Sequence, residues 1–175
     1  MHTQHNPMNY FELFEIPVSL KVDATKLKQQ FFILSRKYHP DFFTQENEND
    51  QAEALDKSSM VNKAFKVFQH QNETIKYVLH LKGLLEEEEK YQLPPDFLME
   101  MMELNEQLSD AKMEDDKASL EKIKVNLAAA EEEIYAPVKS IIENEEDGTL
   151  TTEELLKVKE YYFKKKYLER ILAAI

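Results

Sequence analysis

The residues of this chain with the clearest chemical potential are the consecutive His39, Pro40 and Asp41. They directly follow the helix-forming stretch 26–38 and precede a polar segment, 44–47. Because proline stops a helix and favours an extended backbone at the residue before it, we expect the tripeptide in an exposed loop. That loop would present an imidazole and a carboxylate at the end of a basic helix. The arrangement indicates a docking site for another protein rather than a catalytic pocket.

The same residues argue against enzyme chemistry. His39 and Asp41 are too close in sequence, and too exposed in the expected loop, to form an acid–base pair, and no serine or cysteine nucleophile accompanies them. A carboxylate-bridged metal site in a helical bundle would need glutamate three residues before a histidine. His39, His70 and His80 all lack one. Two isolated glycines cannot build a phosphate-binding loop. We therefore expect no enzyme activity, no metal site and no cofactor.

The composition indicates an all-α protein. The 175 residues allow one domain or two small ones, and a hydrophobic content of 42% supports a packed core. Only two glycines occur, which disfavours the tight hairpins of a sheet. The absence of cysteine excludes disulfides, thiolate metal sites and cysteine nucleophiles.

The charge and the apolar runs limit the partners. A formal net charge of −12 argues against nucleic-acid and anionic-membrane binding, which require basic surface. The first residues lack the features of a signal peptide, and no apolar run approaches the ~20 residues that span a bilayer. We therefore expect a cytoplasmic protein.

Helix periodicity and capping residues divide the chain into two halves. The acidic run 86–89 and Pro94-Pro95 mark the boundary between them. We expect Pro137 to break the helix that begins near 114, Gly148 to end that region, and 151–154 to form a capping box for the last helix. The expected helices cover residues 9–16, 24–38 after an Asp23 N-cap, 48–69, 74–82 before Gly83, 95–111, 114–136 and 152–175.

The helix before the tripeptide has one apolar and one basic side. Taking 100° per residue, Leu27, Phe31, Leu34 and Tyr38 fall within about 40° of one direction and predict the buried face. Ile33 lies on the opposite, basic side. The segment 21–43 carries a net charge of +3, whereas 96–116 carries −7, so we expect two different partners. The basic residues of the helix are Lys26, Lys28, Arg36 and Lys37.

The order of short helix, basic helix, His-Pro-Asp and long helix resembles a J-domain, the module by which DnaJ-type co-chaperones engage DnaK-type ATPase chaperones. The resemblance covers about residues 8–81. It implies that His39, Pro40 and Asp41 contact the chaperone and trigger its ATP hydrolysis. It also implies an electrostatic docking face made of Lys26, Lys28, Arg36 and Lys37. One departure is Phe42, where many J-domains have lysine.

A second unusual surface is expected on the helix that begins near Pro95. With Phe97 at 0°, the residues Met101, Leu104 and Leu108 lie within about 40° and suffice for a core stripe. Other apolar residues share the opposite side with acids, and methionine suits a surface that binds another protein. Alternatively, Leu98 and Met102 pack against a neighbouring helix of the bundle. The residues of this mixed side are Leu98, Met99, Met102, Glu103, Glu106 and Asp110.

Together the two halves resemble the HscB family of iron–sulfur cluster assembly co-chaperones. The resemblance implies an L-shaped, all-α molecule with a J-domain (8–82), a linker (83–94) and a C-terminal three-helix bundle (95–175). It also implies that the partners are a DnaK/HscA-type ATPase chaperone and an IscU-type scaffold protein. The scaffold site would comprise Leu98, Met99, Met102, Glu103, Glu106, Asp110 and Tyr167.

Two alternatives stay open at this point. The chain could be a J-domain co-chaperone for a different client, since only the second half bears on the client. It could also be a helical interaction protein without a chaperone role, in which case the tripeptide is accidental.

Overall fold

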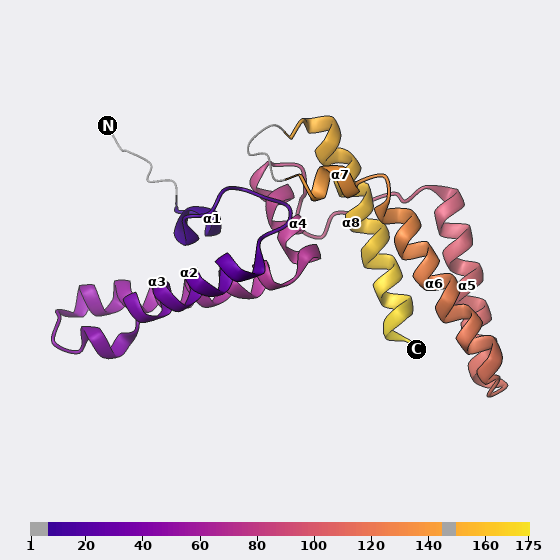
Figure 1. Ribbon diagram of the computed structural model, residues 1–175, viewed down its shortest axis with the longest axis horizontal. Helices are drawn as coiled ribbons and strands as arrows, with labels where there is room; N and C mark the ends of the chain where they lie inside the picture. Colours follow the sequence, from indigo (N-terminus) through magenta and orange to yellow (C-terminus); the bar gives the residue numbers. More distant parts are fainter. Residues whose placement is uncertain (1–6, 145–149) are drawn as a thin grey trace. The chain divides into compact units, whose positions relative to one another are not determined.

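The computed structural model describes residues 7–144 and 150–175, and within these ranges every regular element is a helix, as the composition predicts. The chain divides into two compact units between Val78 and Leu79 (Figure 1). The elements are α1 (Tyr10–Phe14), α2 (Ala24–Lys37), the 3₁₀ helix η1 (Pro40–Phe43), α3 (Glu48–Gln69), α4 (Gln71–Leu81), α5 (Pro95–Met113), α6 (Lys117–Tyr135), α7 (Lys139–Ile142) and α8 (Thr152–Ala173).

The first unit is built on a helical hairpin. Helices α2 and α3 run antiparallel, with η1 at the turn between them (Figure 1). The predicted apolar stripe of α2 faces α3, because Leu27 and Leu34 are buried and Phe31 stacks on Phe65 with ring centroids 3.9 Å apart. The Asp23 carboxylate caps α2 by accepting the Lys26 backbone N–H at 2.8 Å. The packing of α2 on α3 therefore determines where the turn between them, which contains η1, begins.

An aromatic cluster closes the other end of the hairpin. The Tyr10 backbone N–H donates to the Tyr77 hydroxyl at 2.8 Å, and the two rings stack with centroids 4.5 Å apart. The rings of Phe11 and Phe14 pack on Phe68 of α3. Large buried rings contribute strongly to core stability, which explains how a helix as short as α1 stays in place.

The second unit contains a three-helix bundle of α5, α6 and α8, and α7 packs on α8. The predicted stripe of α5 forms part of its core, since Phe97, Met101, Leu104 and Leu108 are all buried. Leu127 of α6 and Leu168 of α8 are fully enclosed. The bundle therefore turns one side of α5 inward and leaves the opposite side of that helix to solvent.

The ends of the helices follow the predicted signals at most positions. Gly83, with φ of 69°, adopts the left-handed conformation that ends a helix, and the Thr151–Glu154 capping box is formed. Helix α6 stops before Pro137, but it starts at Lys117 rather than near 114. Helix α4 starts at Gln71, three residues earlier than expected. Gly148, expected to end the region before the last helix, lies outside the described residues.

The predicted linker contacts the second unit. Lys159 of α8 forms an ion pair with Glu89 at 2.8 Å, and both side chains are largely buried. Two residues on, the Tyr91 ring stacks on Phe163 at 4.5 Å with an interplanar angle of 2°. The segment 79–94 accordingly groups with the second unit. The division into 8–82, 83–94 and 95–175 remains a prediction.

Candidate functional site

The His39-Pro40-Asp41 loop is exposed at the end of α2. His39 is the N-cap of η1, and its Nδ1 accepts the Asp41 backbone N–H at 3.3 Å. An accepting Nδ1 leaves the ring proton on Nε2, which is then the donor available to a partner. The carboxylate of Asp41 lies 3.6 Å from Nδ1, and its side chain is 85% exposed. The loop therefore presents one donor and one acceptor to solvent.

The four basic residues predicted for docking are all exposed, but they do not form one cluster. Arg36 and Lys37 lie in the last turn of α2, next to the loop. Lys26 lies in the first turn of the same helix, about 15 Å away along its axis. The basic residues thus line the length of α2, which suits orientation of a partner more than a single strong contact.

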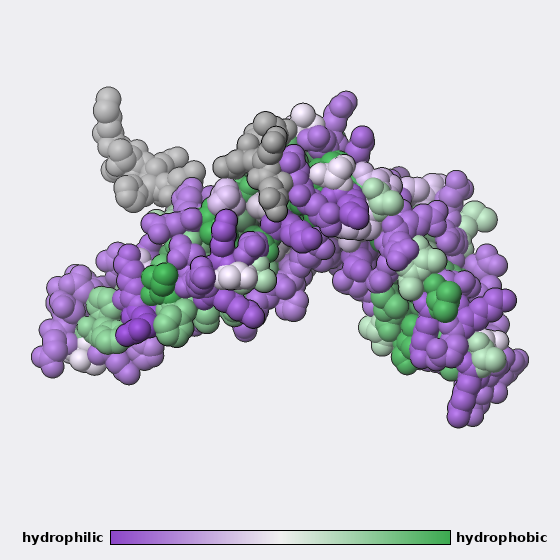
Figure 2. Space-filling model, viewed as in Figure 1, coloured by the Kyte–Doolittle hydropathy of each residue, from purple (hydrophilic) through white to green (hydrophobic). Residues whose placement is uncertain are grey.

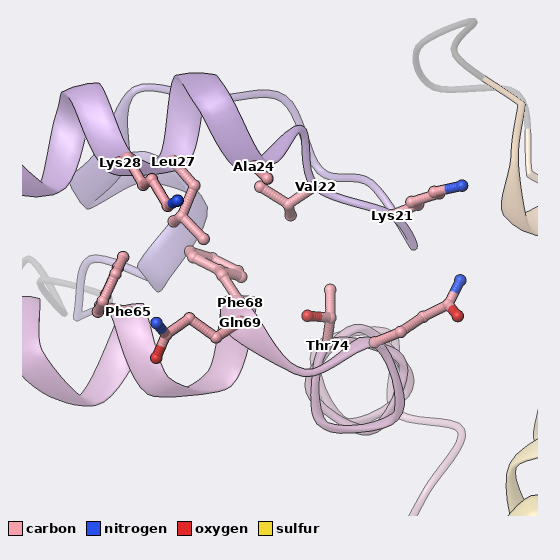
Figure 3. A pocket seen from close by; sticks show the side chains of 10 residues that line it. Lys21, Val22, Ala24, Leu27, Lys28, Phe65, Phe68, Gln69 and Thr74 are labelled. Atoms are coloured by element: carbon pink, nitrogen blue, oxygen red, sulfur yellow. The ribbon is translucent and has the colours of Figure 1, made fainter.

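Lys28 differs from the other three basic residues because it lines a cavity of about 340 Å³ between α2, α3 and α4 (Figure 3). The apolar wall of the cavity includes Leu27, Phe65 and Phe68. Figure 3 shows these side chains between the two helices of the hairpin. We therefore place Lys28 on the flank of the docking face rather than at its centre.

The structure exposes two aromatic side chains near the loop whose burial the sequence reasoning did not address. Phe32 is 63% exposed and Phe42 is 67% exposed. Ile33, noted above on the basic side of α2, is exposed as well. The spacing of 100° per residue that assigned Leu27 and Phe31 to the core also places Phe32 on another side of the helix, about 140° from Leu27. That signal was present in the sequence.

The second candidate surface lies on the outer side of α5. Met99 is 70% exposed and Met102 is 62% exposed, whereas Leu98 is half-buried. Met102 therefore does not pack against a neighbouring helix, as the alternative reading required, and Leu98 does so only in part. Exposed methionines are adaptable contact residues for a protein partner.

Acidic side chains share this side of α5. Glu103, Glu106 and Asp110 are exposed, and they follow Met99 and Met102 at helical spacing. Glu103 accepts a hydrogen bond from the Gln107 amide at 3.4 Å. The result is an apolar patch continued by a row of carboxylates, which complements a partner that is apolar and basic.

Tyr167 reaches the same end of the bundle from α8. Its half-buried ring lies edge-on to Phe97, with centroids 6.2 Å apart, and Phe97 directly precedes Leu98. The Lys164 ammonium lies 5.5 Å from the centre of the Phe97 ring. The structure thus brings Tyr167 next to the start of α5, although the two segments are about seventy residues apart.

Within residues 7–144 and 150–175, no three metal-ligating side chains are grouped together. The described helices also include none that is long and apolar enough to cross a bilayer.

Comparisons with known proteins agree on one family. Residues 93–175 match the family described as the HSCB C-terminal oligomerisation domain. The chaperone HscB from Vibrio cholerae has a similar structure, with a TM-score of 0.71 and 27% identity over 93% of this chain and 92% of that one. The human co-chaperone protein HscB gives a TM-score of 0.78 and 28% identity, over 97% of this chain and 81% of that one. In sequence and structure, the chain is similar to HscB proteins.

Curated HscB proteins match over a shorter span. The co-chaperone protein HscB homolog of Vibrio campbellii is 38% identical over 104 residues, which are 59% of this chain and 61% of the relative. The mouse iron-sulfur cluster co-chaperone protein HscB is 35% identical over 136 residues, or 77% of this chain and 57% of the relative. The matches thus span about three fifths of each relative. Similarity to the two solved HscB structures confirms the all-α fold of a J-domain followed by a C-terminal helical bundle.

Proposed function

We propose that this chain is a two-site adaptor co-chaperone for iron–sulfur cluster assembly. The α5 surface, defined as Leu98, Met99, Met102, Glu103, Glu106 and Asp110 with Tyr167 beside it, binds an IscU-type scaffold protein. The loop surface, defined as His39, Pro40 and Asp41 with the basic residues of α2, binds a DnaK- or HscA-type chaperone. Hydrolysis of ATP by the chaperone is then coupled to capture of the scaffold.

The observation that carries the proposal is that one chain exposes both surfaces, each in a different unit. The side chains of His39 and Asp41 face solvent at the end of a basic helix. Met99 and Met102 face solvent among carboxylates on α5. Charges of opposite sign on the two surfaces favour two different partners, because like charges disfavour the wrong pairing.

The adaptor has no catalytic step of its own. The chaperone performs the hydrolysis, and the scaffold carries the cluster as cargo, so the adaptor requires neither a metal site nor a cofactor. It acts in the cytoplasm, and its activity involves neither nucleic acid nor a membrane. Similarity to HscB co-chaperones supports this role over that of a helical protein unconnected to chaperones.

The loop assignment is tested with His39→Gln. Because the His39 side chain is exposed, the substitution should leave stability within about 0.5 kcal/mol of wild type. We expect stimulation of a purified DnaK- or HscA-type ATPase to be lost, measured as single-turnover ATP hydrolysis. The variant should bind the scaffold as tightly as wild type does.

Two outcomes would count against the proposal. Full stimulation by the His39→Gln protein would show that the loop is not the trigger. Stimulation that depends on His39, together with no detectable scaffold binding in calorimetry, would indicate a co-chaperone for a different client.

A further inference from the structure

Three apolar side chains lie exposed around the loop surface: Phe32 and Ile33 on α2, and Phe42 on η1. We call them the apolar strip. Figure 2 shows apolar side chains among hydrophilic ones at the end of the first unit, where Figure 1 draws the turn between α2 and α3. Isolated exposed apolar residues are common, but three beside one loop form a patch that suits a protein partner.

The core of the first unit does not account for the strip. Phe31, the neighbour of Phe32, makes the aromatic contact with α3 by stacking on Phe65. Phe43, the neighbour of Phe42, is partly buried beside Tyr38 at the opening of α3. In each pair of consecutive phenylalanines, one ring packs inward and the other faces solvent.

Contacts connect the strip to the loop surface. Arg36 follows Phe32 by one turn of α2, and its guanidinium carbon lies 5.8 Å from the centre of the Phe32 ring. The Arg36 carbonyl accepts the His39 backbone N–H at 3.5 Å. The His39 ring, in turn, lies edge-on to Phe42 with centroids 6.1 Å apart. Phe32 and Phe42 are therefore each in contact with a residue of the loop surface, Phe32 with Arg36 and Phe42 with His39.

The charges around the strip indicate what covers it. Lys26, Arg36 and Lys37 lie on the same exposed side of α2 and frame the apolar residues with positive charge. A complementary surface must be apolar at its centre and acidic at its edge. An acidic edge also argues against a second copy of the loop surface, which would bring like charges together.

We propose that Phe32, Ile33 and Phe42 anchor the chain in an apolar pocket bordered by carboxylates on the ATPase chaperone. This inference rests on the proposed function and adds to it the kind of chaperone surface that is recognised. The basic residues then steer the encounter, whereas the strip determines how long the complex lasts. Phe42, which replaces the lysine of many J-domains, changes a charge contact into an apolar one.

Salt separates the two contributions. Exposed ion pairs are screened as ionic strength rises, whereas burial of apolar surface is not. A complex held mainly by basic residues would lose its affinity in high salt. A complex held by the apolar strip keeps most of its affinity in high salt. It loses that affinity when the three residues of the strip are made polar.

The test compares wild type with a Phe32→Gln, Ile33→Asn, Phe42→Gln protein. The dissociation constant for the purified chaperone is measured by calorimetry at about 0.1 M and about 0.5 M NaCl. We expect the variant to bind at least about tenfold more weakly at both concentrations. Its single-turnover ATPase rate at saturation should equal that of wild type, because His39, Pro40 and Asp41 are unchanged.

Val125→Gln is the matched control, since Val125 is an equally exposed apolar residue on α6 of the second unit. Its dissociation constant should stay within about twofold of wild type. Circular dichroism of all three proteins verifies the fold. A strip variant that binds like wild type, or a control that weakens binding equally, would overturn the inference.

Two further outcomes separate this inference from the proposed function. If wild type stimulates the chaperone in a His39-dependent way and the strip variant binds normally, only the role of the strip is wrong. If folded wild type neither binds nor stimulates the chaperone, both fail. A wild-type dimer in sedimentation that the strip substitutions dissociate would assign the strip to a second copy of this chain.

Discussion

At the scale of single residues, three methionines of α5 have different surroundings within one helical turn. Met101 is fully buried in the bundle, whereas Met99 and Met102 are mostly exposed. The period of the helix explains the difference, since neighbours in sequence lie about 100° apart around the axis. The same residue type therefore packs the core at one position and faces solvent at the next.

Replacing Met99 and Met102 by alanine separates binding from folding. We expect Met99→Ala with Met102→Ala to weaken scaffold binding at least about tenfold. The two side chains are exposed in the free protein, and alanine removes the apolar contacts that they would bury in the complex. Stability should change by less than about 1 kcal/mol. Calorimetry with the purified scaffold and urea unfolding measure the two effects.

Met101→Ala is the matched control. Removal of this enclosed side chain leaves a cavity and should cost about 2–5 kcal/mol of stability. The folded fraction should still bind the scaffold with wild-type affinity. If the exposed pair and Met101 weakened scaffold binding equally at matched folded concentration, the assignment of the α5 surface would be wrong.

At the scale of the elements, capping side chains define where α6 and α8 of the second unit start. Thr151 accepts the Glu154 backbone N–H at 3.2 Å, and the Glu154 carboxylate accepts the Thr151 N–H at 2.9 Å. The Asp116 carboxylate caps α6 by accepting two hydrogen bonds from Ser119. The Ser119 backbone N–H donates at 3.1 Å and the Ser119 hydroxyl at 2.6 Å. Both caps satisfy N–H groups that the helix itself leaves unpaired.

Thr151→Ala tests the first cap. The substitution removes the side-chain acceptor and should reduce the free energy of unfolding by about 1 kcal/mol. Hydrogen exchange should accelerate at the first amides of α8 but not at the first amides of α6. Unchanged exchange at the start of α8 would show that tertiary packing alone holds it.

Asp116 makes stability depend on pH. Its hydrogen bonds with the Ser119 side chain and backbone lower the pKa of this carboxyl below the ordinary value of 3.8. A lowered folded-state pKa contributes stability that is present above the ordinary value and is lost as pH falls through the lowered one. Asparagine keeps the capping oxygen without titrating, so we expect Asp116→Asn to lose less stability on acidification.

Urea midpoints at about pH 5 and about pH 2.5 measure this effect. The wild-type protein should lose part of its advantage over Asp116→Asn at the lower pH. An identical difference between the two proteins at both pH values would contradict this role of the cap.

Local signals predicted the elements well where a cap or breaker was present. Asp23, Gly83 and the Thr151–Glu154 box are features of neighbouring residues, so the sequence contains them directly. The start of α4 was missed because no glycine or proline marks it. His70 alone adopts an extended conformation between α3 and α4. The Thr74 hydroxyl of α4 donates to the carbonyls of Val67 in α3 and of His70, so it bonds across the junction.

At the scale of the whole molecule, the two surfaces belong to different units. The helical periodicity of the sequence predicted which sides of α2 and α5 face outward, because that depends on each helix alone. Contacts between distant segments could not be read in this way. The Glu89–Lys159 ion pair, the Tyr91–Phe163 stack and the Tyr167–Phe97 contact all require the folded bundle.

This division predicts that the two activities can be lost separately. Mutations at sites that share no contacts usually act additively. The Met99→Ala, Met102→Ala protein should therefore stimulate the chaperone normally when no scaffold is present, while the His39→Gln protein should still bind the scaffold.

Both surfaces together would let one chain couple scaffold binding to ATP hydrolysis by the chaperone. The most direct test is single-turnover ATP hydrolysis by the purified chaperone, with and without the scaffold. Wild type should stimulate hydrolysis in both cases and more strongly with the scaffold present. His39→Gln should abolish both effects, and Met99→Ala with Met102→Ala should abolish only the increase. Scaffold-dependent stimulation that persists in the His39→Gln protein would contradict the account.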